Sequence, residues 1–188
     1  MVLPPRVARG TGPVTALTML RVAGRLTLAR GGADGVALLD VESGGLVGHL
    51  DAGSAAPVQA LTSVADEREE WPLLAVGGVD GVLRLWDVAR QQQVAETPLG
   101  SGAITALATV PTPDGPLLAG LCGRQLRVWR CRDGQPYELG SLAEPLTALC
   151  TVRLPGRVLL ATGDAGGALR LWDPALIKTW SLRRTNMW

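Results

Sequence analysis

The sequence predicts an all-β fold of repeated four-stranded antiparallel sheets, on three observations. Apolar runs at 73–76 and 82–86 flank a Gly/Asp-rich turn at 77–81, which is the pattern of a β-hairpin. The same hairpin pattern recurs at 26–41, 117–130 and 158–173. A short apolar segment precedes each hairpin, and its anchor residues, spaced 44, 46 and 42 residues apart, are Val14, Val58, Ile104 and Leu146. A period in the low forties indicates a repeat architecture.

The repeats divide the chain into four blades, each a sheet of four strands. Blade 1 covers about 13–56, with strands expected at 14–20, 25–29, 36–41 and 45–50. Blade 2 covers about 57–101 and ends on a Gln-rich outer strand at 92–97. Blade 3 covers about 102–144, with its last strand at 137–142, and blade 4 covers about 145–184, with its last strand at 178–182. Residues 1–12, rich in Pro, Arg and Gly, form an N-terminal tail, and 185–188 form a C-terminal tail.

The signature residues of these repeats resemble the WD-repeat β-propeller family. The residues are "LRLWD" after a "DG" turn, an "AL" strand about twenty residues upstream, and a Gly48-His49 dipeptide between two blades. The resemblance covers about residues 13–182, and the repeat sequences are similar to those of WD-repeat arrays in high-GC bacteria. It implies an all-β propeller of four-stranded antiparallel blades, the rigid scaffold of a protein-interaction module. The structural signature lies at Trp86, Asp87, Trp129, Trp172 and Asp173, while Leu39 replaces the tryptophan in blade 1.

In this family a buried hydrogen-bonded set often joins an inter-blade His, a Ser/Thr, the turn Asp and the Trp. The resemblance implies that only blade 2 approaches this set, with His49, Asp80 and Trp86, and with Gly77 or Gly78 at the hydroxyl position. We therefore expect apolar packing to stabilise the blades, with each tryptophan burying on the order of 150–250 Å² between them.

Arginines recur two residues before the three tryptophans, at Arg84, Arg127 and Arg170. They have two interpretations: a ladder that binds a ligand, or stems packed on the blade with guanidinium groups paired to acidic residues at a blade seam. The second is favoured, because such stems cover apolar surface while the charge is neutralised.

Partner proteins are expected to bind the loops on one face of the blades. The candidate residues, chosen from their positions in the repeat, are Asp34, His49, Asp51, Asp80, Ser101 and Arg124. Two alternatives stay open: a sensor or regulatory segment of a larger signalling protein, such as one linked to an NTPase, and, least favoured, an enzyme that uses the central channel.

Four blades leave the closure of the ring open. The chain closes as a four-bladed ring, pairs with a second copy into a homodimer with eight blades, or is a fragment of a longer protein.

The remaining chemistry is sparse. The formal net charge of +1 excludes an electrostatic case for nucleic acid or an anionic membrane. One His and one Lys leave few general bases, and we expect no catalytic residue, no metal and no cofactor, since phosphate-binding and zinc motifs are absent. The three cysteines, at spacings of 9 and 19, match no disulfide or zinc pattern, which favours the cytoplasm. No stretch is long and apolar enough to span a bilayer.

Overall fold

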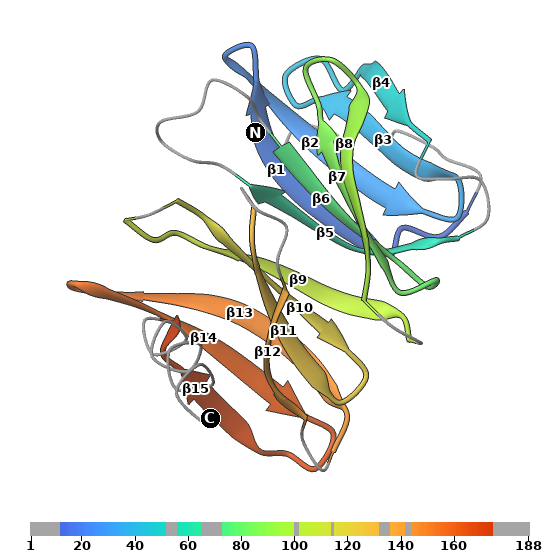
Figure 1. Ribbon diagram of the computed structural model, residues 1–188. Helices are drawn as coiled ribbons and strands as arrows, with labels where there is room; N and C mark the ends of the chain where they lie inside the picture. The colour runs from blue at the N-terminus through green and yellow to red at the C-terminus, as the bar shows by residue number, and fades with distance from the viewer. Residues whose placement is uncertain are drawn as a thin grey trace, which may run out of the picture. The chain divides into compact units, whose positions relative to one another are not determined.

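The computed structural model describes residues 12–51, 56–64, 73–99, 102–113, 115–131, 136–141 and 144–174. It contains fifteen strands in four antiparallel sheets, and it confirms the predicted all-β fold class (Figure 1). Each sheet is a simple up-and-down meander, because every strand pairs with the next one in the sequence. The chain divides into two compact units, Met1–Ala103 and Ile104–Trp188, each of which holds two sheets.

The first unit contains blades 1 and 2. Blade 1 consists of β1 (Ala16–Val22), β2 (Arg25–Gly32), β3 (Gly35–Asp40) and β4 (Leu46–Leu50). Blade 2 consists of β5 (Val58–Val64), β6 (Leu73–Gly78), β7 (Val82–Asp87) and β8 (Gln92–Pro98). The first strand begins at Ala16, two residues later than expected, and β2 runs three residues beyond Ala29. The last residue of β2, Gly32, pairs across the turn with Gly35, which has a φ of 91°, a conformation that glycine adopts without steric cost.

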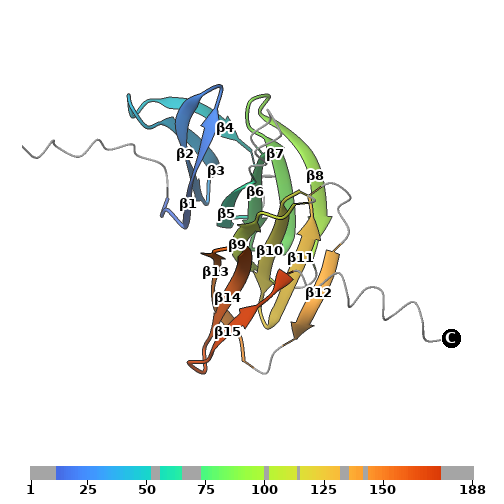
Figure 2. The same ribbon diagram turned by 90° about the vertical axis from the view of Figure 1, so that its left-hand side faces the viewer.

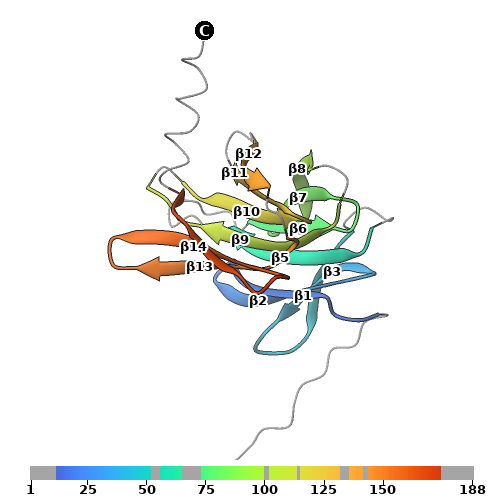
Figure 3. The ribbon, with the colours of Figure 1, turned by 90° about the horizontal axis from the view of Figure 1, so that it is seen from below.

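The second unit contains blades 3 and 4. Blade 3 consists of β9 (Ile104–Val110), β10 (Leu117–Cys122), β11 (Gln125–Arg130) and β12 (Pro136–Ser141), and Figure 2 shows these strands in order. Blade 4 consists of β13 (Leu146–Leu154), β14 (Arg157–Asp164) and β15 (Leu169–Trp172), and the long β13–β14 hairpin is clear in Figure 3. The fourth strand predicted at 178–182 lies outside the described residues, as do the two predicted tails except for Gly12.

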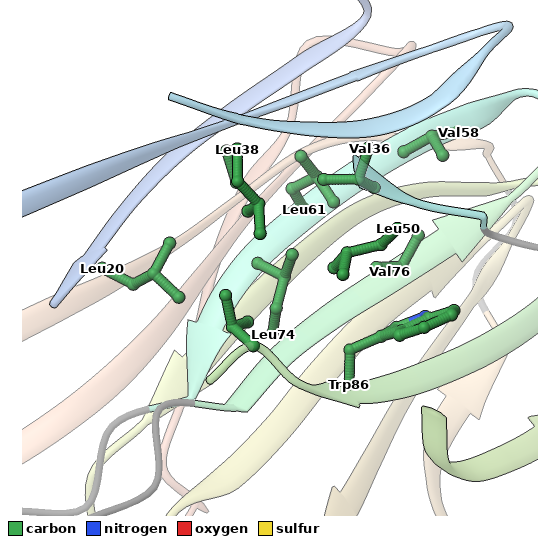
Figure 4. Packing of buried hydrophobic residues seen from close by; sticks show 11 residues of the cluster. Leu20, Val36, Leu38, Leu50, Val58, Leu61, Leu74, Val76 and Trp86 are labelled. Atoms are coloured by element: carbon green, nitrogen blue, oxygen red, sulfur yellow. The ribbon is translucent and has the colours of Figure 1, made fainter. Parts of the chain in front are cut away.

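The two faces of each sheet differ, and opposite faces meet in the core of each unit. We call the side that carries the tryptophan of the third strand, or Leu39 in blade 1, the tryptophan face, and the other side the reverse face. In the first unit the core joins the reverse face of blade 1 to the tryptophan face of blade 2. Figure 4 shows Leu20 and Leu38 on one side of this core and Leu74 and Trp86 on the other.

The second unit repeats this packing. Its core joins reverse-face residues of blade 3, such as Leu121 and Val128, to Leu160 and the partly buried Trp172 of the tryptophan face of blade 4. β6 and β10 are almost entirely buried, as their near-continuous apolar runs predict.

Candidate binding surface at the turn end of the sheets

The turn between the second and third strands of blade 2 is fixed by Asp80. Its Oδ1 accepts a hydrogen bond from the backbone N–H of Val82 (3.1 Å), and its Oδ2 accepts one from Nη2 of Arg84 (2.8 Å). Gly81 follows with a φ of 71°. A carboxylate that bonds to the backbone two residues later is the usual device for holding a tight turn. The same arginine lies 3.6 Å from a carboxylate oxygen of Glu96, so its charge is balanced within the blade.

Blades 1 and 4 fix the corresponding turns with the same chemistry. Arg30 donates from one nitrogen to both carboxylate oxygens of Asp34, at 2.9 and 2.7 Å. In blade 4 the Asp164 carboxylate, whose side chain is only 2% exposed, pairs with Nη1 of Arg170 and accepts a hydrogen bond from the Ala168 N–H (2.9 Å). The turn aspartates are therefore structural in three of the four blades.

Blade 3 departs from this arrangement. Arg124 occupies its turn, after Gly123 with a φ of 60°, and its strand arginine, Arg127, donates to the side-chain oxygen of Gln125 (2.9 Å). The prediction that the strand arginines pair with acidic residues is confirmed for Arg84 and Arg170. Their partners lie in the turn of the same blade, whereas we expected a seam between blades. The physical reason is distance, because the aspartate in the turn just before the strand lies closer to the arginine than any acidic residue of the next sheet.

Asp80 and Asp164 are ionised at neutral pH. The Arg170 guanidinium and the Ala168 N–H lower the pKa of Asp164. Burial raises the pKa of Asp80, but hydrogen bonds from Arg84 and the Val82 N–H outweigh it, and the net pKa is below the usual value. A negative charge on these residues thus strengthens the turns and needs no external cation.

The remaining predicted binding residues are more exposed. His49 lies on β4, opposite Ala37, and Asp51 directly follows that strand; both side chains are exposed. Arg124 is exposed at the turn of blade 3. Ser101 lies outside the described residues.

The first unit gathers its candidates at one end. In a meander, the turn between the second and third strands and the exit of the fourth strand lie at the same end of the sheet. The corresponding ends of blades 1 and 2 lie side by side, because Thr15 Oγ1 donates at 3.2 Å to the carbonyl of Gly31 in blade 1 and also approaches the carbonyl of Val58 in blade 2. The Val79 N–H donates to the Pro57 carbonyl (3.1 Å), which ties the blade 2 turn to the start of that blade. We call this end, in each unit, the turn end; it contains Asp34, Asp51 and Asp80 in the first unit.

The second unit has its own turn end. The Leu146 N–H of blade 4 donates to the Gly123 carbonyl of blade 3 at 2.9 Å, which places the Arg124 turn beside the start of β13. Asp164 lies at the same end of blade 4, opposite Leu146 in the strand register.

The expected polar set around the tryptophans is wrong for blade 2. Trp86 Nε1 is buried and has no hydrogen-bond partner among the described residues, and Asp80 bonds to Arg84. The residue opposite Arg84 in the strand register is Val76, not Gly77 or Gly78. An apolar side chain therefore stands where the hydroxyl is required.

Blade 4 instead retains part of the set. Trp172 Nε1 donates to Thr162 Oγ1 at 2.9 Å, and Thr162 is 1% exposed. Thr162 lies opposite Arg170, the same register position as Val76 in blade 2. The sequence carried this signal, since "LLATGD" has a threonine where "LLAVGG" has a valine, but the register was needed to read it.

In blade 3 the same position is Gly120, opposite Arg127. A Cβ there would lie 3.0 Å from Cζ3 of Trp129, so the indole ring lies against the bare backbone. Trp129 Nε1 is buried without a hydrogen-bond partner within the described part of the chain.

The aspartate that follows the tryptophan is a turn residue. Asp87, 4% exposed, accepts hydrogen bonds from the Arg90 N–H (2.9 Å) and Arg90 Nη1 (2.7 Å). Asp40 does the same in blade 1 with Ser43, through the backbone N–H (2.7 Å) and Oγ (2.8 Å). Both carboxylates thus close the turn between the third and fourth strands.

Among the described residues there is no cluster of three or more His, Cys, Asp or Glu side chains that could hold a metal ion. No helix in the described ranges is long and apolar enough to cross a membrane. Burial raises the pKa of the Cys122 thiol, which therefore stays protonated and unreactive at neutral pH.

Comparison with known proteins gives the fold but no family. No family model matches the chain, and no curated protein sequence is similar to it. The crystal structure of the computationally designed Ika4 protein is similar, with a TM-score of 0.68 and 19% sequence identity over 89% of this chain and 95% of that chain. At this identity the likeness shows the fold alone, which is that of a designed propeller.

Proposed function

We propose that this chain is a non-catalytic protein-interaction scaffold of the WD-repeat type, which binds protein partners through the turn end of its sheets. The "LRLWD" residues support the family, because Trp86 packs in the core and Asp87 closes a turn. The unpaired thiols of Cys122 and Cys150 support a reducing compartment, and we place the protein in the cytoplasm.

One observation carries this proposal: the turn carboxylates are held inside the blade while other polar side chains are exposed beside them. The carboxylates of Asp34, Asp80 and Asp164 each form an ion pair with an arginine of the same blade. His49, Asp51 and Arg124 are exposed, so they are the better candidates for partner contacts. A rigid scaffold does not have to order its backbone on binding, so less conformational entropy is lost, which favours affinity for a partner.

Arg124 gives the sharpest test. The Arg124→Glu variant reverses an exposed charge at the turn end of the second unit. Arg153→Glu is the matched control, because Arg153 is also exposed but lies near the end of β13, at the opposite end of blade 4. The tagged wild-type chain and both variants are used to purify partners from cells of the source organism.

We expect proteins that co-purify with the wild type to be lost with Arg124→Glu and kept with Arg153→Glu. Thermal unfolding of both variants checks that the fold is intact, since surface changes usually alter stability by less than about 0.5 kcal/mol. The turn end is not the binding surface if both variants retain the same partners, or if both lose them equally.

A further inference from the structure

The exposed apolar side chains of this chain concentrate on two sheet faces. Leu17 and Met19 are 58% and 56% exposed on the tryptophan face of blade 1, together with Leu46 of β4. Leu169 and Leu171 are 73% and 59% exposed on the reverse face of blade 4. An apolar sheet face that its own unit leaves uncovered marks an interaction surface.

The reverse face of blade 4 shares its central residue with the reverse faces that are covered. The second strand of every blade carries an alanine at the same register position, and these residues are Ala29, Ala75, Ala119 and Ala161. In blade 3 this alanine is flanked by Ala108 and Val128, and all three are buried in the core shared with blade 4. In blade 4 it is flanked by Cys150 and Leu171, which are exposed.

The partner of a reverse face is seen twice in this chain. In the first unit the tryptophan face of blade 2 covers the reverse face of blade 1, and in the second unit the tryptophan face of blade 4 covers that of blade 3. The reverse face of blade 4 therefore fits a tryptophan face. Blade 1 has such a face: Leu17, Met19 and Leu46 are exposed on it, around the buried Ala37 and Leu39 of its third strand. The reverse face of blade 4 and the tryptophan face of blade 1 are thus the two kinds of surface that pack together inside each unit.

The centres of both faces carry no unpaired charge. Within the described residues, the reverse face of blade 4 has one charged residue, Arg157, at the exposed first position of β14. The rest of this face consists of Cys150 and apolar residues: Ala148, Val152, Leu154, Leu159, Ala161, Leu169 and Leu171. The tryptophan face of blade 1 contains Arg30, which the carboxylate of Asp34 neutralises through two contacts. A buried charge is tolerated when it is paired and hydrogen-bonded in this way. The other polar residues of this face, Arg21 near the β1–β2 turn and His49 on the outer strand, are exposed at its margin.

We propose that a second copy of this chain covers these faces: blade 4 of each copy packs its reverse face on the tryptophan face of blade 1 of the other. A two-fold axis forms both contacts at once, and the pair then contains eight blades, a number within the size range of propellers. The inference does not depend on what the turn end binds.

The experiment is a measurement of solution mass by light scattering across a dilution series of the full chain. We expect twice the 19.7 kDa of one chain. Met19→Lys on blade 1 and Leu171→Glu on blade 4 should each weaken the pair on the order of 100-fold, because a charge enters an apolar contact. Val94→Glu is the matched control, since Val94 is 54% exposed on the outer strand of blade 2, away from both faces.

Mixing the two variants adds a test that misfolding cannot imitate. A mixed pair has one unaltered interface and one that sets Lys against Glu, so the mass should return to that of two chains. Leu17→Lys and Leu169→Glu repeat the test on the same faces if either first variant fails to fold.

Cys150 supplies a second readout. Its thiol lies on the reverse face of blade 4 and is exposed in the single chain. We expect slow maleimide labelling of Cys150 in the wild type and fast labelling in Met19→Lys, although the change is on another blade.

Four results would overturn the proposal. A wild-type monomer with protected Cys150 means that the chain closes on itself, and a monomer with reactive Cys150 means that the faces stay open. A mass that rises continuously with concentration means open-ended assembly. A dimer that survives both face variants, or dissociates equally with Val94→Glu, uses another surface.

Discussion

The hydroxyl of Thr162 should stabilise the protein only through the indole of Trp172. Thr162→Val removes the acceptor of the 2.9 Å bond from Trp172 Nε1 and leaves a side chain of nearly the same shape. A net hydrogen bond contributes about 0.5–1.5 kcal/mol, and a buried donor left without a partner costs about 1–3 kcal/mol. Because Trp172 is only partly buried, water can reach it in part, and we expect a loss of about 1–1.5 kcal/mol.

The assay is urea and thermal unfolding, followed by circular dichroism. For a chain of this size each kcal/mol corresponds to roughly 2–4 °C in Tm, so Thr162→Val should lower it by about 2–6 °C. Phenylalanine has no N–H, and in a Trp172→Phe background the same change should therefore cost almost nothing. A double-mutant cycle isolates this term.

The reciprocal change lies in blade 2. Val76→Thr places a hydroxyl at the register position of Thr162, beside the buried and unpartnered Trp86 Nε1. We expect it to be neutral or to stabilise by up to about 1 kcal/mol, whereas a valine-to-threonine change at a buried site without a donor destabilises. The reasoning is refuted if Thr162→Val costs the same with and without Trp172, or if Val76→Thr costs more than about 1 kcal/mol.

Two further predictions concern the turns and the core. The hydrogen bond from Arg170 lowers the pKa of Asp164. Burial raises the pKa of Asp87, but hydrogen bonds from Arg90 outweigh it, and the net pKa is below the usual value. The two carboxylates therefore contribute fully to stability above their unfolded-state pKa, and this contribution is lost as pH falls through the folded-state pKa. The unfolding midpoint in urea should therefore drop as pH is lowered from 4 towards 2, and a midpoint that stays constant there contradicts this account. In blade 3, Gly120→Ala should destabilise by about 1–3 kcal/mol, because its Cβ would lie about 3.0 Å from both Leu107 and the Trp129 ring; a stability equal to that of the wild type would show that the core has room.

The third and fourth strands were predicted best. The outer strands expected at 45–50, 92–97 and 137–142 appear as Leu46–Leu50, Gln92–Pro98 and Pro136–Ser141. Turn residues with strong local preferences set these bounds, and Asp87 and Asp40 are examples, since each bonds to the turn that follows it. The first strand of blade 1 was displaced by two residues because no turn residue marks its start, and only its pairing with β2 determines it.

The period of the repeat, the all-β class and the burial of the inner strands came from the sequence alone, because they depend on local chemistry: apolar runs, Gly/Asp turns and their spacing. The tertiary structure alone decided which side chains meet. The register of antiparallel strands places Thr162, Val76 and Gly120 at one position, and so determines which tryptophan has a hydrogen-bond partner. It also assigns Arg84 to Asp80 of the same turn, and shows two apolar faces without a neighbour in their own unit. A one-residue shift in register exchanges the faces of a strand, so no pattern along the chain could have settled these contacts.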